Sequence, residues 1–188
     1  MSPMVRQPLT TEHALLGFLQ AGPMHGYQLY QQLTAARDLG LVWRLKESQL
    51  YRLLSRLEEA GYIEAVYAPQ TSRPARRLLH LTDAGRAAFD AWVRAPVPHG
   101  RDLRLEFLAK LYFARQMGPG VVATLIGGQR TLLAGSRDDL AAEAEEIRSA
   151  RPFDWLVLEF RLGQIRAMLD WLDVCGATMQ SNSERQPT

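Results

Sequence analysis

The spacing of apolar residues over the first half of the chain predicts three helices, a two-stranded hairpin and a fourth helix. Apolar side chains recur every three to four positions in three segments, which is the period of a helix with one buried face. The period then changes to that of a strand, with β-branched and aromatic residues from Tyr62 to Tyr67. The predicted helices cover about 12–21, 25–36, 48–60 and 83–94, and the strands cover 62–67 and 77–81, with a short extended stretch at 41–43.

The third predicted helix has two faces of different chemistry. Leucines at 50, 53, 54 and 57 fall on one side, where they would pack against the first two helices. Gly61 stands just beyond the helix, where a left-handed backbone ends a helix at little cost. The opposite side carries Ser48, Arg52 and Ser55. A cation among hydroxyl groups suits contact with a polar, anionic surface.

Helical periodicity returns after a break formed by Pro96, Pro98 and Gly100. We therefore expect two domains, residues 1–95 and residues 96–188. The second would consist of a helix over about 103–117, a long helix from the Gly118-Pro119 break to about Ser149, and a last helix over about 153–177. The polar residues after Met179 predict a disordered tail from about residue 180.

The two long C-terminal helices carry apolar residues at coiled-coil spacing. Two such helices can form a hairpin within one chain or pair across a two-fold axis. A hairpin alone would leave apolar surface uncovered, so we expect these residues to form a homodimer interface. The predicted dimerisation residues are Leu133, Leu140 and Ile147 in the first helix and Leu158, Leu162, Ile165, Leu169 and Leu172 in the second.

This order of elements predicts a fold that is mainly α with a small β-hairpin, namely a winged helix-turn-helix followed by a helical, coiled-coil-like dimerisation arm. In that fold the third helix enters the major groove of double-stranded DNA and the hairpin, or wing, lies beside it. Cations precede the helix and occupy the wing loop, and no acidic residue occurs between residues 65 and 82. The predicted DNA-binding residues are Tyr27, Lys46, Ser48, Gln49, Tyr51, Arg52, Arg56, Arg73, Arg76 and Arg77.

Composition changes this picture little. The net charge of the 188 residues is only +2, but residues 1–95 hold 11 Lys and Arg against 8 Asp and Glu, whereas residues 96–188 hold 11 against 12. Cys175 is the single cysteine, so an internal disulfide is excluded. The chain begins without a secretory signal pattern and has no apolar run approaching the length of a bilayer span. We therefore expect a cytoplasmic protein that does not cross a membrane.

No pattern in the sequence indicates catalysis or a cofactor. The histidines at 13, 25, 80 and 99 do not fall at metal-ligand spacing with Cys175 or with a carboxylate. The glycine pairs match no phosphate-binding loop. We expect no enzyme, no metal and no cofactor. A winged-helix adaptor that binds another protein remains the alternative to a DNA-binding regulator.

Three motifs occur in order over roughly residues 12–92. The first is Leu15-Leu16-Gly17-Phe18-Leu19 with Gly22-Pro23-Met24-His25-Gly26-Tyr27-Gln28-Leu29. The second is Ser48-Gln49-Leu50-Tyr51 with Leu54, Arg56-Leu57-Glu58 and Gly61-Tyr62-Ile63. The third is Ser72-Arg73-Pro74-Ala75-Arg76-Arg77 with Leu81-Thr82-Asp83-Ala84-Gly85-Arg86. This set resembles the PadR-type transcriptional regulators. The family often has Pro at the position of Arg52, which places that position near the start of its helix.

The resemblance implies a dimeric bacterial transcription factor, most often a repressor, whose C-terminal helices form the dimer. Some members bind small aromatic or amphipathic molecules near that interface, so the resemblance leaves a small-molecule effector open. By resemblance, Tyr27 and Tyr51 would contact DNA phosphates, with Gln49 and Arg52 at base edges. The arginine at 52 would add a cation where the helix enters the groove.

Overall fold

The structure, a computed structural model, describes residues 10–68 and 76–184 and divides into two compact units. Unit 1 comprises Met1–Val93 with Leu108–Phe113, and unit 2 comprises Arg94–Phe107 with Ala114–Thr188. The division after Val93 lies close to the boundary that the sequence predicted between residues 95 and 96. The sequence did not predict that residues 108–113 would join the first unit.

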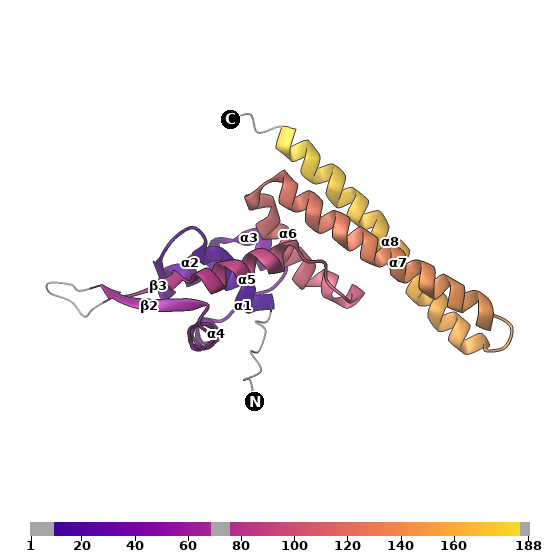
Figure 1. The fold of residues 1–188 in the computed structure, drawn as a ribbon, viewed down its shortest axis with the longest axis horizontal. Coiled ribbons are helices and arrows are strands. Elements are labelled where there is room, and N and C mark those ends of the chain that lie inside the picture. The colour runs from indigo at the N-terminus through magenta and orange to yellow at the C-terminus, as the bar shows by residue number, and fades with distance from the viewer. Residues whose placement is uncertain (1–9, 69–75, 185–188) are drawn as a thin grey trace. The chain divides into compact units, whose positions relative to one another are not determined.

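Unit 1 combines short helices with a small antiparallel sheet (Figure 1). Its elements are α1 (Thr10–Leu19), β1 (Met24–His25), α2 (Gly26–Ala35), α3 (Arg37–Gly40), α4 (Glu47–Glu59), β2 (Ile63–Ala68), β3 (Arg76–Leu81) and α5 (Asp83–Arg94). The strand order is β1-β3-β2, and the β2–β3 pairing runs from Ile63 opposite Leu81 to Ala68 opposite Arg76. The predicted mainly α fold with a winged hairpin is confirmed.

Two short elements of unit 1 were not predicted. β1 consists of Met24 and His25, which pair with Leu79 and Leu78 of β3. α3 is a single turn placed before the stretch at 41–43, which was expected to be extended but begins as a turn. Neither element is long enough to show a hydrophobic period. β1 also depends on pairing with residues more than 50 positions away, which local sequence cannot reveal.

The core of unit 1 forms where α1, α2 and α4 pack on the sheet. Leu16, Leu29, Leu54 and Leu79 are each at most 1% exposed. Phe113, from the part of α6 (Glu106–Met117) that belongs to this unit, packs edge-on against aromatic rings of α1 and α5. These aromatic side chains are therefore core residues of unit 1.

The junctions around the hairpin follow the turn chemistry that the sequence predicted. Gly61 has a φ of +75°, the left-handed conformation expected just beyond α4. Thr82 accepts a hydrogen bond at Oγ1 from the N–H of Gly85, at 3.0 Å, and so caps α5. The same hydroxyl donates to the carbonyl of Gly61 at 2.7 Å, which joins the end of α4 to the start of α5.

Unit 2 is built on a hairpin of two long helices, α7 (Pro119–Ile147) and α8 (Pro152–Glu184), with the short 3-10 helix η1 (Gly100–Arg104) against α8. α7 and α8 lie side by side and antiparallel (Figure 1). Gln129 of α7 is fully buried and its side-chain amide bonds both backbone groups of Val97: Oε1 accepts from the N–H at 2.7 Å, and Nε2 donates to the carbonyl at 3.1 Å.

The residues predicted to form the dimer interface lie inside this hairpin. Leu133, Leu158, Leu162, Ile165 and Leu172 are at most 9% exposed. Leu140 and Ile147 are partly buried against the cluster of Ala144, Leu158 and Leu162, and Leu169 is partly buried. These eight residues therefore pack within the hairpin of the single chain, and their predicted contact with a second copy stays a prediction. Heptad spacing shows that a helix buries one face but does not identify the helix that covers it.

The predicted start of the disordered tail also differs from the structure. α8 continues to Glu184, beyond the predicted end near residue 177. The extension is physically reasonable because a helix adds residues cooperatively, and no Gly or Pro follows Gly176 before Pro187. Within residues 10–68 and 76–184, no helix combines the length and the apolar character needed to cross a bilayer.

Candidate nucleic-acid interface

α4 is amphipathic because its leucines are spaced to face the core and its polar residues are spaced to face outward. Leu50, Leu54 and Leu57 are at most 1% exposed, and Leu53 is 8% exposed. The opposite side presents Ser48, Gln49, Tyr51, Arg52 and Ser55, all of which are exposed. The helix can therefore offer a row of donors and acceptors to a ligand without disturbing the core.

The start of α4 is capped by a residue that the sequence assigned to DNA bases. The Oε1 atom of Gln49 accepts a hydrogen bond from the backbone N–H of Lys46 at 3.1 Å. This is one half of a capping box, in which the side chain at the third helical position turns back to the N-cap residue. The side chain of Lys46 itself is exposed beside this cap.

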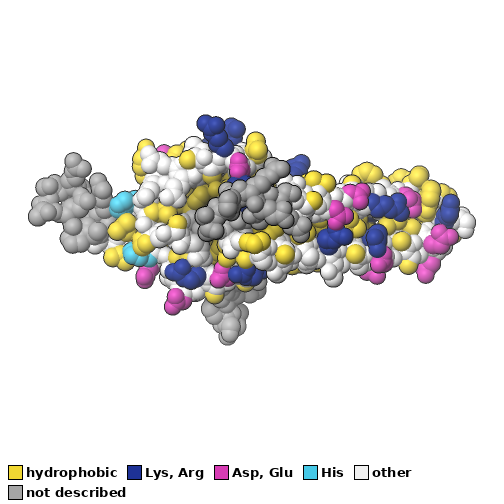
Figure 2. Space-filling model, turned by 90° about the horizontal axis from the view of Figure 1, so that it is seen from above, with side chains coloured by type: hydrophobic (Ala, Val, Ile, Leu, Met, Phe, Trp, Pro, Cys, Tyr) yellow, Lys and Arg dark blue, Asp and Glu magenta, His cyan; other side chains and the backbone are white. Residues whose placement is uncertain are grey.

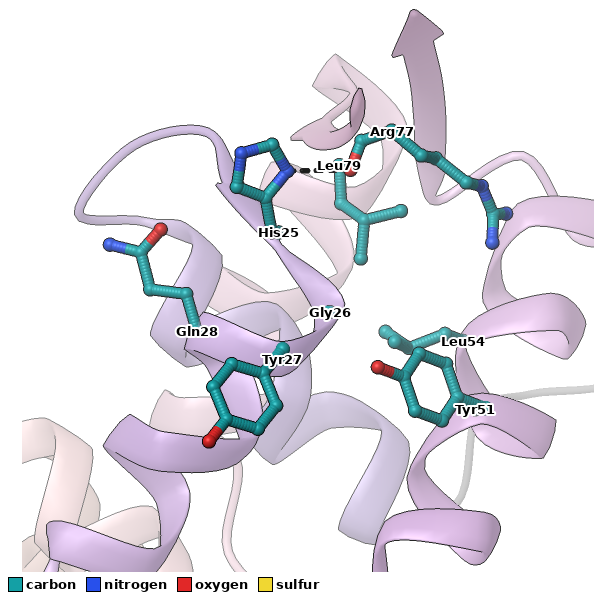
Figure 3. A pocket seen from close by; sticks show the side chains of 8 residues that line it. All are labelled: His25, Gly26, Tyr27, Gln28, Tyr51, Leu54, Arg77 and Leu79. Atoms are coloured by element: carbon teal, nitrogen blue, oxygen red, sulfur yellow. Dashed lines mark hydrogen bonds between the residues drawn. The ribbon is translucent and has the colours of Figure 1, made fainter. Parts of the chain in front are cut away.

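Gly26 allows α4 to approach the start of α2 closely. A Cβ atom at position 26 would lie only 2.8 Å from Cε1 of Tyr51. No real Cβ tolerates this distance, so the ring of Tyr51 occupies space that only glycine leaves open. The hydroxyl of Tyr51 is directed from α4 toward the start of α2 (Figure 3).

His25 ties the same junction to the wing. Its Nδ1 atom donates a hydrogen bond to the backbone carbonyl of Arg77 at 2.9 Å (Figure 3). The ladder between β1 and β3 adds backbone pairing at the same place. The first turn of α2, the middle of α4 and the base of the wing are thereby held together. This contact gives His25 a structural role.

These elements surround an open cavity of about 470 Å³. Its wall includes His25 and Gly26 from the β1–α2 junction, Tyr51 from α4, and Arg77 from β3. Tyr27 stands at its mouth with 57% of its surface exposed, and Tyr51 is 42% exposed. Two phenol rings at the edge of this depression can donate hydrogen bonds to an anionic group.

Two of the predicted DNA-binding arginines form ion pairs with carboxylates of the same chain. Arg56 forms an ion pair with Glu12 of α1 at 2.9 Å, and the side chain of Glu12 is only 4% exposed. Arg77 forms an ion pair with Glu58 in the last turn of α4. The two pairs connect α4 to α1 and to the wing. Neither acidic partner could be predicted from the sequence, because each pairing depends on how the elements pack.

The other predicted DNA-binding residues are either exposed residues of α2 and α4 or arginines of the wing. The exposed residues are Tyr27, Lys46, Ser48, Gln49, Tyr51 and Arg52, and they surround the junction of α2 and α4. Arg73 lies outside the described residues, and Arg76 begins β3. Within the part of the chain that the structure describes, no ion pair involves Lys46 or Arg52, so both cations are available to an anionic ligand.

We also searched the described residues for a metal site and for a reactive thiol. No group of three or more His, Cys, Asp or Glu side chains in residues 10–68 and 76–184 could hold a metal ion. Cys175 is buried, and burial raises the pKa of its thiol to about 11. A thiol with this pKa is almost entirely protonated near neutral pH and is a poor nucleophile.

Two protein families match this sequence in its two halves. Residues 15–91 match the transcriptional regulator PadR-like family. Residues 103–180 match the family described as virulence activator alpha C-term. The first match covers α2, α4 and the wing, and the second covers α7 and nearly all of α8.

Two related proteins are similar to this chain over most of its length. The negative transcriptional regulator PadR of Bacillus subtilis is 27% identical over 171 residues, which are 86% of this chain and 93% of that protein. A probable transcriptional regulator of Mycobacterium tuberculosis, Rv1176c, is 26% identical over 89% of this chain and 96% of its own length.

Solved structures of similar proteins include Bacillus subtilis PadR in two complexes. The complex with operator DNA has 24% identity and a TM-score of 0.45, covering 91% of this chain and 99% of that one. The complex with p-coumaric acid has 23% identity and a TM-score of 0.40, covering 96% of this chain and 99% of the other.

Proposed function

The chain belongs to the PadR-like family of transcriptional regulators, and on this premise we propose that it is a homodimeric, sequence-specific DNA-binding repressor. The observation that carries the proposal is the outer face of α4. Tyr51 and Arg52 are exposed there beside Lys46, on a helix whose opposite side is buried. A helix that is supported on one side and polar on the other has the form required to enter a major groove.

Arg52 is the residue that we assign to base recognition. It is exposed in the second turn of α4 and is not neutralised by a described acidic residue. A guanidinium can form two parallel hydrogen bonds with O6 and N7 of guanine, which distinguishes this base from the others. Gln49 can read a base edge with Nε2 while Oε1 retains the cap on Lys46, or with both atoms if binding releases the cap.

We assign phosphate contact to exposed residues of the cavity and of the start of α4. The phenols of Tyr27 and Tyr51, the hydroxyl of Ser48 and the ammonium of Lys46 are exposed near the start of α4 or across from it. Such groups fix the position of a protein on the duplex without reading its sequence. The wing arginines at 73 and 76 belong to the same proposal, as cations beside the groove.

Arg56 and Arg77 have a positioning role in this proposal. Each is paired with a carboxylate of the same chain, so contact with a phosphate would require the carboxylate to share the guanidinium. Their ion pairs instead fix the angle of α4 relative to α1 and to β3. A recognition helix that is held in this way loses less conformational freedom when it binds DNA.

Replacement of Arg52 tests the assignment of the recognition helix. Arg52→Ala should weaken binding to the operator by about 10- to 100-fold, because a bidentate contact to guanine contributes about 1–3 kcal/mol. Arg94→Ala is the matched control, because Arg94 is exposed at the end of α5, away from α4 in the sequence, and its loss should change affinity by less than about twofold.

Fluorescence anisotropy with labelled DNA from upstream of the gene that encodes this chain gives both affinities. Equal affinities for the wild type, Arg52→Ala and Arg94→Ala would reject α4 as the recognition helix.

We also propose that a small aromatic or amphipathic molecule releases the DNA. Unit 2 supports this with an open groove of about 430 Å³ where the end of α6 meets the start of α7 and the end of α8. Its floor includes Val122 and Ile126, and Arg115 and Arg130 lie on its rim. Arg130 already forms an ion pair with Asp173, so a ligand carboxylate would compete with that pair.

Filling the groove tests this regulatory site. Ala123 is exposed in the groove, and Ala123→Trp should occupy its volume while leaving the buried floor unchanged. A panel of hydroxycinnamic and benzoic acids should release operator from the wild type but not from Ala123→Trp. Release from both proteins at the same concentration would exclude the groove as the binding site.

A further inference from the structure

A second open cavity of about 470 Å³ lies in unit 1 and shares no lining residue with the cavity beside Tyr51. It is formed by the second half of α2, by α3 and by the segment 41–45 that leads to α4. Leu33 and Trp43 contribute apolar and aromatic surface to its wall, and Arg37 and Arg44 contribute guanidinium groups. The volume falls in the range of small-molecule sites, roughly 300–1,000 Å³.

We propose that this cavity binds a planar aromatic carboxylate, whose ring packs against Trp43 and whose anionic group is held by Arg37 and Arg44. The site lies within unit 1 itself, whereas the groove proposed above for a releasing molecule lies in unit 2. It does not rest on the proposed function, because it follows from the charge, the apolar surface and the unpartnered donor around one cavity.

The two arginines of the cavity are not neutralised. Along the α7–α8 hairpin, Figure 2 shows basic side chains beside acidic ones, as in the ion pair of Arg137 with Asp138. By contrast, neither Arg37 nor Arg44 forms an ion pair within the part of the chain that the structure describes, and none of the residues that line the cavity is acidic. Guanidinium groups donate directional hydrogen bonds to a carboxylate, so this pair of cations suits an organic anion.

The wall of the cavity favours an aromatic ligand over a bare inorganic anion. Leu33 is 7% exposed, whereas Leu41, in the turn after α3, is 88% exposed. A Cβ atom at Gly40 would meet nothing within 4 Å, so the space beside α3 is open. A ring placed between Trp43 and the leucines would remove apolar surface from water, which a phosphate or chloride ion would not do.

Trp43 also carries a donor that lacks an acceptor. Its Nε1 atom is buried and has no hydrogen-bond partner among the described residues, which is unfavourable for a polar group. Its backbone N–H donates to the carbonyl of Leu39 at 3.1 Å, so the main chain is anchored to α3. Because Nε1 is closed off in the chain alone, the indole must turn to offer this N–H to a carboxylate. The bound ligand then satisfies the donor.

Occupation of the cavity acts on the start of α4. Arg44 lies two residues before Lys46, which is the N-cap residue of α4 and one of the proposed phosphate contacts. A carboxylate held by Arg44 lowers the positive potential at this point and weakens the attraction of DNA phosphates. This consequence rests on the proposed function, whereas the binding site does not.

Titration of the isotope-labelled full chain with 2-naphthoate, without DNA, tests the site by nuclear magnetic resonance. The four tryptophans, at 43, 92, 155 and 171, give four indole N–H signals, and Trp43→Phe identifies the first by its loss. The Trp43 signal should move until the site saturates. The uncharged analogue 2-naphthylmethanol should need at least about tenfold higher concentration, because it lacks the carboxylate. A Trp43 signal that stays in place at millimolar 2-naphthoate, or that responds equally to the alcohol, would overturn the proposal.

Replacement of the two arginines tests the contact with the anion. Arg37→Gln and Arg44→Gln should each weaken 2-naphthoate binding by about tenfold, because each removes a charge-assisted hydrogen bond. Arg94→Gln is the matched control, since Arg94 is exposed on α5 and does not line the cavity. Ala123→Trp fills the groove of unit 2 and should leave the response of Trp43 unchanged. Loss of that response in Ala123→Trp, or wild-type affinity in both glutamine variants of the cavity, would overturn the site.

Operator affinity distinguishes failure of the site from failure of the proposed function. In the Ala123→Trp background, saturating 2-naphthoate should weaken operator binding by at least about fivefold, the lower end of the usual coupling between two sites. Addition of Arg44→Gln should remove most of this effect. A Trp43 signal that responds in a protein that binds no operator would support the site and reject the proposed function. Unchanged operator affinity at saturating 2-naphthoate would overturn the action on α4.

Discussion

Single residues decide how close the elements of the candidate interface lie to each other. Gly26 lets the ring of Tyr51 rest on the start of α2, and His25 fixes the same turn to the carbonyl of Arg77. Each residue of the sequence His25-Gly26-Tyr27 therefore has a distinct role at this junction. One residue bonds the wing, the next leaves space for α4, and the third is exposed at the cavity.

Replacing Gly26 should disturb this junction specifically. Gly26→Ala places a methyl group against Tyr51 and should lower the free energy of unfolding by about 1–3 kcal/mol, the usual cost of overpacking. Gly40→Ala is the matched control, since a Cβ at Gly40 would meet nothing within 4 Å. Urea denaturation measures both changes. Equal stability of the two variants would show that Tyr51 moves aside at no cost.

Other residue-level contacts could not be predicted because they depend on burial. Glu12 is 3% exposed, although glutamate is rarely buried without a partner. Its partner, Arg56, lies 44 positions away and has the spacing of an outward-facing cation. Sequence alone therefore placed Arg56 with the DNA-binding residues, and only the fold reveals that α1 supplies a carboxylate at that point.

At the scale of elements, sequence periodicity predicted what each helix buries better than what it buries against. α5 has the predicted bounds, Asp83–Arg94, and the predicted leucine face of α4 is buried. The same reasoning placed the heptad residues of α7 and α8 between two chains; the structure shows that they pack within one chain, and their contact with a second copy stays a prediction.

The segment that follows α5 is held by one side chain. Gln129 of α7 donates to and accepts from the backbone of Val97, and all three groups are buried. These two hydrogen bonds fix the segment between Pro96 and Pro98 to the long hairpin of unit 2. Glutamine is the side chain suited to this role, because its amide carries a donor and an acceptor side by side.

Removing this amide should destabilise unit 2. Gln129→Ala leaves the N–H and carbonyl of Val97 buried without partners and should lower the free energy of unfolding by about 2–3 kcal/mol. Gln31→Ala, at an exposed position of α2, should change it by less than about 0.5 kcal/mol. Thermal unfolding followed by circular dichroism compares the two variants. An unchanged transition for Gln129→Ala would mean that water replaces the amide.

At the scale of the whole molecule, the proposed function joins a DNA-binding unit to a helical unit in a homodimer. A two-fold dimer presents two copies of α4, and operators of such dimers carry half-sites about one turn of DNA apart. The order of elements and the PadR-like motifs made the DNA-binding unit predictable from sequence. The participation of residues 108–113 in unit 1 was not predictable, because a helix shared between two units has no distinct pattern.

The most direct test of the central claim is the affinity of the full chain for DNA from upstream of its own gene, compared with a scrambled fragment, at low and at elevated salt. The proposed function predicts binding that weakens with salt, because Lys46, Arg52 and the wing arginines displace counterions, while the preference for the upstream fragment persists because base contacts do not depend on that release. Equal binding to both fragments that disappears at elevated salt would contradict sequence-specific recognition. Absence of binding at low salt would contradict the DNA-binding assignment altogether and favour a winged-helix adaptor.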